Sequence, residues 1–109
     1  MTSLLAKYKK EREGKEVLET ENGFAIWFCR GEVCYIEDIF VDLYSRQEGH
    51  AAKMADQICV IAKERGCKTL LGSVNAQTNG ANTSLKVLLG YGMKLHAVEG
   101  QMIYFTKEI

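Results

Sequence analysis

The chain has 109 residues, of which 47% are hydrophobic and 26% are charged, so it suits a single domain (1–109) with one core and is too short for two. Its 14 basic and 14 acidic residues balance, which argues against nucleic acid or an anionic membrane as a partner. No long apolar segment precedes the first charges, so we expect neither a signal peptide nor a transmembrane helix, and a cytoplasmic protein.

The first part of the chain predicts a helix followed by an antiparallel meander. Thr2 or Ser3 can cap the helix, and Gly14 can end it. Residues 15–20 are a candidate short strand, and residues 24–30 and 33–41, which are rich in aromatic and β-branched residues, predict two further strands. Between the first two, Asn22-Gly23 predicts a tight turn, because both residue types tolerate the positive φ angles of such turns.

The rest of the chain alternates between helical and extended patterns. A helix that ends near Gly66 has an apolar stripe at intervals of three and four residues, made of Ala51, Met54, Ala55, Ile58, Ile61 and Ala62. The remaining predicted elements are a strand at 68–74, a helix at 82–89 and strands at 93–98 and 101–107. On the second helix, Leu85, Leu88 and Leu89 are expected to point inward.

The connection between the third strand and the long helix is a candidate anion site. Its residues 46–52 form a segment that we call the cradle. The first N–H groups of a helix lack intrahelical partners, and the helix dipole favours negative charge there. Gly49 and Ala51 have small side chains that let phosphate oxygens approach, and Arg46 adds a cation. An ordinary strand-to-helix connection with a glycine at the helix start is the alternative.

The spacing around the cradle carries a resemblance to a known family. The strand 35–41 ends at Val41, Arg46 follows five residues later, Gly49 three residues after that, and Ala51 two beyond. This pattern, with the order of the elements, resembles the GNAT family of acetyl-CoA-dependent N-acetyltransferases over about residues 16–107. The resemblance implies an α/β (α+β) fold: a central, mostly antiparallel mixed sheet of about six strands, flanked by helices and splayed between strands 33–41 and 68–74.

The resemblance also implies acetyl-CoA as co-substrate, and no metal. In such proteins the strand before the cradle carries a bulge, and the splay holds the pantetheine arm. The backbone of Ile39, Phe40 and Val41 would pair with that arm. The pyrophosphate would lie on Arg46, Gln47, Glu48, Gly49, His50, Ala51 and Ala52. The second helix would place Asn82, Ser84 and Leu88 near the thioester.

Acetyl transfer to an amine requires removal of a proton, because a primary amine is mostly protonated at neutral pH. Glu37 and Asp38 are the carboxylates nearest the splay, and strand alternation would put them on opposite faces. By resemblance to the diamine acetyltransferase branch, we favour Glu37 over Asp38 as the base or the amine-binding anion. Both could equally be acids on a solvated sheet face.

The sequence departs from the family pattern in two places. Leu88 stands where such proteins have a tyrosine that protonates the leaving thiolate, and Tyr91 lies at a different angle around the helix. The segment before the strands is also short for the family, so we expect an N-terminally shortened member with an acceptor side that is open or completed by a partner chain. The acceptor would be a protein lysine, an N-terminus or a small amine, and a homodimer is a reasonable expectation. A catalytically impaired CoA-binding or interaction module is the alternative.

The other reactive side chains do not suggest a site. The four cysteines form no C-x-x-C pair and no histidine has metal-finger spacing to them, so we expect free thiols and no metal. Cys29 and Cys34 could face each other across a hairpin. His50 is expected to be an exposed neighbour of the phosphates without a catalytic role, and His96 to be a surface or hydrogen-bonded histidine.

Overall fold

A six-stranded sheet organises the computed structural model, which describes residues 3–109. The strands are β1 (Glu16–Glu19), β2 (Gly23–Arg30), β3 (Val33–Val41), β4 (Thr69–Asn75), β5 (Lys94–Glu99) and β6 (Met102–Glu108). The helices are α1 (Leu4–Glu13), α2 (His50–Glu64) and α3 (Ala81–Gly90), with a short 3₁₀ turn, η1 (Leu43–Ser45), before α2. The predicted order of elements is confirmed, and η1 is the one addition.

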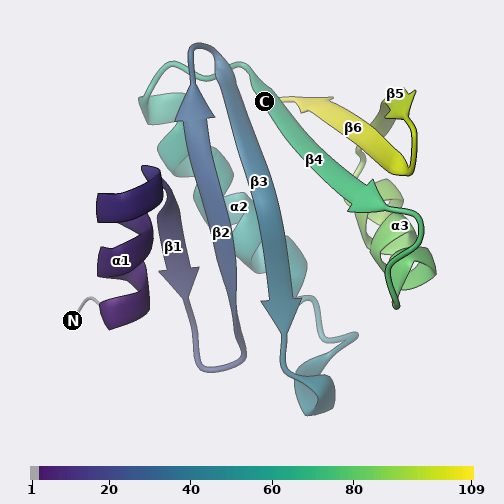
Figure 1. Ribbon diagram of the computed structural model, residues 1–109, viewed down its shortest axis with the longest axis horizontal. Helices are drawn as coiled ribbons and strands as arrows, with labels where there is room; N and C mark the ends of the chain where they lie inside the picture. Colours follow the sequence, from purple (N-terminus) through teal and green to yellow (C-terminus); the bar gives the residue numbers. More distant parts are fainter. Residues whose placement is uncertain (1–2) are drawn as a thin grey trace.

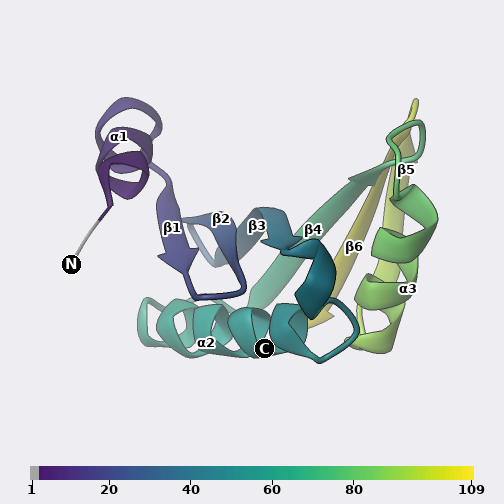
Figure 2. The same cartoon turned by 90° about the horizontal axis from the view of Figure 1, so that it is seen from below.

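The sheet has the order β1-β2-β3-β4-β6-β5 (Figure 1). All neighbours are antiparallel except β3 and β4, which are parallel and joined through α2. This is the mixed, mostly antiparallel sheet that the sequence predicted. Seen from below, α2 runs along one face of the sheet, whereas α1 lies on the opposite side beside β1 (Figure 2). We call the face opposite α2 the open face.

The core lies between α2 and the sheet. Met54 and Ile58 of α2 are buried with Leu70 of β4 and Phe105 of β6. Most of the predicted stripe is confirmed, although Ala51 and Ile61 are only half-buried. On α3, Leu85 and Leu88 pack against the core as expected.

One predicted core residue of α3 is wrong. Leu89 is 57% exposed. One residue rotates a helix by about 100 degrees, so a short helix that packs through Leu85 and Leu88 turns Leu89 away from the sheet.

Both ends of α1 are capped by residues that the sequence predicted. The Ser3 hydroxyl accepts a hydrogen bond from the Ala6 amide at 3.0 Å, and Gly14 ends α1 with φ 68°. The alternative cap, Thr2, lies outside the described residues. In the part of the chain that the structure describes, no helix has the length and apolar character needed to span a lipid bilayer.

The turn between β1 and β2 differs from the prediction. Neither Asn22 nor Gly23 has a positive φ. Instead the Thr20 hydroxyl accepts from the amides of both residues at 3.1 Å. Gly23 is required for another reason: a Cβ there would lie 2.0 Å from the carbonyl oxygen of Phe40 on β3. The glycine therefore serves close strand packing and not turn conformation.

The four cysteines are free, and Cys34, Cys59 and Cys67 are buried. Cys29 and Cys34 are register partners in the β2–β3 hairpin, so they do face each other. Burial raises the pKa of the Cys67 thiol to about 11 and raises that of Cys34 further. Both thiols are therefore protonated near neutral pH and are poor nucleophiles.

Candidate functional site

The site is built around a gap between β3 and β4. The two strands pair only over Val33–Ile36 and Thr69–Gly72. Beyond that point β3 continues with β2 alone and β4 with β6 alone, and the ribbons diverge (Figure 1). We call this gap the wedge, and its position confirms the predicted splay.

A β-bulge in β3 stands at the start of the wedge. Ile36 is opposite Trp27 and Asp38 is opposite Ile26, so Glu37 is the extra residue. The extra residue of a bulge is left unpaired in the ladder and changes where side chains point.

The bulge overturns the expectation that the two acids lie on opposite faces. Ile36 and Ile39 both pack against the core although they are three residues apart. Both residues between them therefore belong to the open face, where Glu37 and Asp38 are exposed. Strict alternation fails because the bulge absorbs one residue.

Glu37 already holds an amine. The Lys15 Nζ donates to Glu37 Oε1 at 2.7 Å and also lies 3.1 Å from a Glu13 carboxylate oxygen. The hydrogen bond to Glu37, followed by that to Glu13, raises the pKa of Lys15. Asp38 forms no ion pair within residues 3–109. In this structure, Glu37 is therefore occupied by an ammonium group of the described chain itself, whereas Asp38 is not.

The cradle presents a row of unpaired backbone amides. No amide from Arg46 to Ala52 donates a hydrogen bond to another described residue, and the first helical bond comes from Lys53 to the Gly49 carbonyl. Gln47 has φ 66° and Gly49 has φ 81°, and no side chain caps α2. Successive amides in such alternating conformations form an anion-binding concavity, and the dipole of α2 adds to it.

The space in front of the cradle is open. A Cβ added to Gly49 would meet no atom within 4 Å, and Gln47, Glu48, Gly49 and Ala52 are exposed. Ala51 is half-buried. The cradle is therefore open to solvent, and no other group of the described chain occupies the space beside Gly49.

Arg46 connects the cradle to the end of β3. Its Nε donates to the Val41 carbonyl at 3.0 Å, and its guanidinium carbon lies 5.7 Å from the centre of the Phe40 ring. These contacts hold the arginine beside the strand whose backbone was predicted to pair with pantetheine. The terminal guanidinium nitrogens have no ion-pair partner among the residues that the structure describes.

Asn22 supports the cradle from the β1–β2 turn, a role that the sequence did not suggest. Its carbonyl accepts from the Asp42 amide at 2.7 Å, and its side-chain Oδ1 accepts from the Ser45 hydroxyl at 3.2 Å. Its Nδ2 lies 3.4 Å from Nδ1 of His50, whose Nε2 lies 3.6 Å from Glu48. His50 is thus half-buried and held in place, and not freely exposed as expected. The Asn-Gly pair marked a turn, but nothing in the sequence placed that turn beside residue 50.

The predicted site residues at the start of α3 form no side-chain hydrogen bond to the cradle in the described structure. Asn82 and Ser84 are exposed in its first turn, after Gly80 with φ 85°. Leu88 lies at the wedge: its Cδ2 would be 3.4 Å from a Cβ on Gly72, the last β4 residue paired with β3.

The Tyr91 hydroxyl is hydrogen-bonded to α2, so it does not take the place of a tyrosine at position 88. Its hydroxyl donates to Asp56 Oδ1 on α2 at 2.6 Å, and the Lys107 Nζ lies 4.2 Å from its ring centre. Burial, followed by the hydrogen bond to Asp56, raises the pKa of the Tyr91 hydroxyl.

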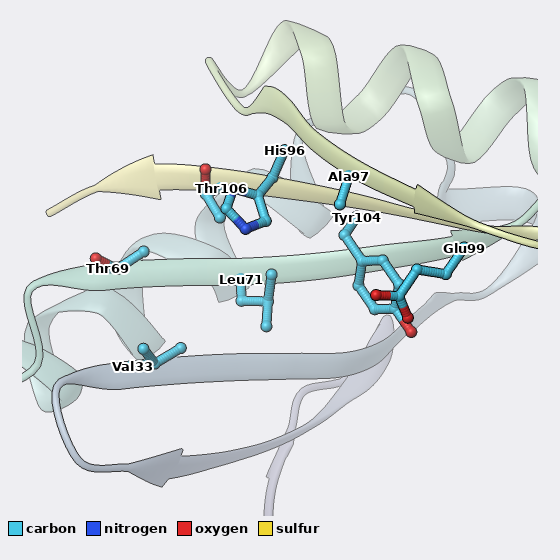
Figure 3. Close-up of a pocket in the computed structure, with 8 residues that line it drawn as sticks. All are labelled: Val33, Thr69, Leu71, His96, Ala97, Glu99, Tyr104 and Thr106. Carbon is cyan, nitrogen blue, oxygen red and sulfur yellow. The ribbon is translucent and has the colours of Figure 1, made fainter.

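The open face carries a cavity of about 360 Å³ (Figure 3). The figure shows the His96 side chain directed over it from β5 and the Tyr104 ring extending from β6 across β4. Its lining residues are Val33, Thr69, Leu71, His96, Ala97, Glu99, Tyr104 and Thr106. A second cavity of about 310 Å³ lies at the β1–β2 turn near Asn22. At the start of the wedge, the hydroxyls of Tyr35 and Ser73 are 2.5 Å apart and link β3 to β4.

Solved structures share this architecture. The chain is similar to the PaiA N-acetyltransferase of Thermoplasma acidophilum in complex with coenzyme A, with TM-score 0.74 and 12% identity over 81% of this chain and 54% of that one. It is similar to an acetyltransferase of Bacillus subtilis in complex with CoA, with TM-score 0.71 and 14% identity over 94% of this chain and 82% of that one. A protein of Desulfovibrio desulfuricans assigned to the GNAT family has TM-score 0.71 and 13% identity over 84% of this chain and 65% of that one.

These likenesses lie in the fold and not in the sequence. No protein-family model and no curated protein matches the chain by sequence. The chain spans about half the length of the PaiA structure. The splayed mixed sheet, the bulge before the splay and the amide cradle after it are nonetheless arranged as the sequence resemblance implied. The chain has the fold of the GNAT acetyltransferases.

Proposed function

We propose that the chain binds acetyl-CoA and transfers the acetyl group to a primary amine. The observation that carries this proposal is the cradle of unpaired amides from Arg46 to Ala52 at the end of the strand that borders the wedge. An acyl-CoA has a pyrophosphate joined to a narrow pantetheine arm, and the cradle and the wedge offer one place for each. Two of the similar structures contain coenzyme A, which supports the same type of ligand here.

In this proposal the backbone does most of the cofactor binding. The amides of the cradle and the Arg46 guanidinium would hold the pyrophosphate, and the backbone of β3 from Ile39 to Val41 would pair with the pantetheine arm. Asn82 and Ser84 would flank the arm from α3. Glu37 has no register partner on β2, so its N–H would be the candidate donor to the oxyanion of the tetrahedral intermediate.

The acceptor side of the proposal rests on Glu37. Its 2.7 Å contact with the Lys15 ammonium supports a role in binding a primary ammonium group. We therefore assign Glu37 to amine binding, with Asp38 on the same face as the candidate base. The amine loses one proton before attack, the new C–N bond replaces the C–S bond, and the second proton leaves with the thiolate as free CoA.

A second candidate function has its own support. Leu88 lies at the wedge and Tyr91 is bound to Asp56, so no tyrosine of α3 or its end is positioned to protonate the thiolate. A thiolate is a tolerable leaving group, so this loss slows transfer without forbidding it. If transfer is too slow to measure, the chain is a CoA-binding or protein-interaction module with the same cofactor site.

Two measurements distinguish these functions. Calorimetric titration with acetyl-CoA tests the cofactor site, and a chain that binds no CoA or acetyl-CoA would overturn both functions. Mass spectrometry of peptides, lysine and small diamines incubated with the chain and acetyl-CoA tests transfer. Acetylated product above the rate without protein supports the enzyme, whereas binding without product supports the module. Product detection is preferable to a thiol reagent, because Cys29 of the chain is only half-buried and would react.

A further inference from the structure

Strand β5 forms one edge of the sheet, and two of its apolar side chains are exposed. It pairs with β6 on one side and has no neighbouring strand on the other within residues 3–109. Leu95 is 63% exposed and Val98 is 60% exposed. An edge strand with exposed apolar side chains is a template for pairing with another strand.

A second β-bulge decides which side chains of β5 share a face. Leu95 is opposite Phe105 and Ala97 is opposite Tyr104, so His96 is the extra residue. Partners in an antiparallel pair point to the same face.

The register then sorts the strand into two rows. On the open face, the β6 partners Thr106, Tyr104 and Met102 lie opposite Lys94, Ala97 and Glu99. On the face covered by α2, which we call the helical face, Phe105 and Ile103 lie opposite Leu95 and Val98. Without the bulge, Lys94 and Glu99 would be on opposite faces, because their positions differ by five, an odd number.

The bulge also changes the direction in which the backbone N–H and C=O groups of β5 point. Adjacent pairs in an antiparallel ladder alternate between hydrogen-bonded and non-hydrogen-bonded. Leu95 and Val98 therefore direct their backbone groups to the same side of β5, and Lys94 and Glu99 both direct theirs to the other side. Two copies of β5 can therefore pair antiparallel about a two-fold axis between His96 and Ala97. In that arrangement, opposed residues share a sheet face, and their backbone groups point in compatible directions.

We propose that the chain forms a homodimer in which β5 pairs antiparallel with β5 of a second copy, extending the sheet across a two-fold axis. In this register Lys94 lies opposite Glu99 of the partner subunit, and Leu95 lies opposite Val98 of the partner subunit. Each contact occurs twice, as two-fold symmetry requires. The charged ends protect the edge against other strands, while their complementarity favours this one partner.

The dimer would also join the two open faces. Lys94 of the partner subunit would approach Glu99, which lines the open-face cavity. Opposite charges across strands stabilise a pair and like charges destabilise it, so the charge pattern provides the test.

The experiment uses charge exchange in the full chain. Sedimentation equilibrium should show a dimer for the unmodified chain. Lys94→Glu or Glu99→Lys alone should weaken the dimer about tenfold or more, because each variant creates two like-charge pairs. The double variant Lys94→Glu/Glu99→Lys should restore the dimer. Lys7→Glu on α1, which changes charge at the far edge of the sheet, should leave the dimer unchanged.

A mixture of the two single variants gives the sharpest result. One carries glutamate at both positions and the other carries lysine at both, so each should form heterodimers with the other and few homodimers. A chain that stays monomeric at all concentrations overturns the proposal. So does a dimer whose affinity is the same in the single and double variants, since its interface would lie elsewhere. Circular dichroism confirms that every variant is folded.

Discussion

The cradle can be tested by placing a carboxylate at Gly49 and comparing it with the same change at Gly66. These glycines flank the two ends of α2, with φ 81° and 87°. A Cβ at either position would meet no atom within 4 Å. Gly49→Asp and Gly66→Asp should therefore carry a similar conformational cost, about 1 kcal/mol for an L-residue in the left-handed region. For a domain of this size that cost lowers Tm by about 4 °C.

The two variants should differ in acetyl-CoA affinity. Two unit charges about 4 Å apart repel by about 1 kcal/mol even in bulk water, and a pyrophosphate carries two. A carboxylate at position 49 should thus cost about 2 kcal/mol of binding, or roughly 30-fold in Kd. The 15 residues of α2 place position 66 about 22 Å from the cradle, beyond the Debye length of about 10 Å, so its affinity should not change.

Calorimetry with two probes makes the assay specific. Acetyl-CoA contains the pyrophosphate, whereas S-acetylpantetheine does not. Gly49→Asp should weaken the first and leave the weaker binding of the second unchanged. A folded Gly49→Asp variant that binds acetyl-CoA with unchanged affinity would refute the reasoning. Equal losses in both glycine variants would refute it too, because the effect would then come from strain in α2.

Three further predictions concern the acceptor, the leaving group and the core. Lys15→Met should lower KM for primary amines several-fold by freeing Glu37, and Glu37→Gln should raise it about tenfold; steady-state kinetics in which neither changes KM would remove Glu37 from the acceptor site. Leu88→Tyr should raise kcat about tenfold or more and leave the calorimetric Kd for acetyl-CoA unchanged, and an unaltered kcat would show that thiolate protonation is not limiting. Ile58→Ala should cost about 3 kcal/mol in urea unfolding because the side chain is 0% exposed, whereas Val60→Ala, 58% exposed, should cost under about 0.5 kcal/mol, so similar losses would contradict the core assignment.

Much of the architecture was predictable because it depends on local pattern. The stripe around Met54 and Ile58 predicted α2, and the apolar run of 33–41 matched β3 residue for residue. Gly14 ends α1 in the left-handed conformation that its position suggested. The helix start that follows Arg46 and Gly49 predicted the unpaired amides of the cradle, since these involve only neighbouring backbone groups, while anion binding there stays a prediction.

The errors occurred where distant segments meet. Asn22-Gly23 predicted a positive-φ turn, but Gly23 is required by the approach of Phe40, and Asn22 supports the cradle. Glu37 was identified as a candidate acid, but its ion pair with Lys15 depends on how α1 is placed beside the sheet. A single sequence carries no signal for such pairs.

The amino-acid sequence by itself determined the elements of this protein, their order and the cradle, because periodicity, caps and helix-start amides act over a few residues. Tertiary structure decided which residues form the two bulges, Glu37 and His96, because a bulge is defined by the register of two strands, whereas the family resemblance implied only that the first strand has one. One bulge puts Glu37 and Asp38 on the same face, and the other matches Lys94 with Glu99 of a second copy. The chemistry that we propose for the wedge, and the dimer that we propose for β5, follow from one extra residue in each strand.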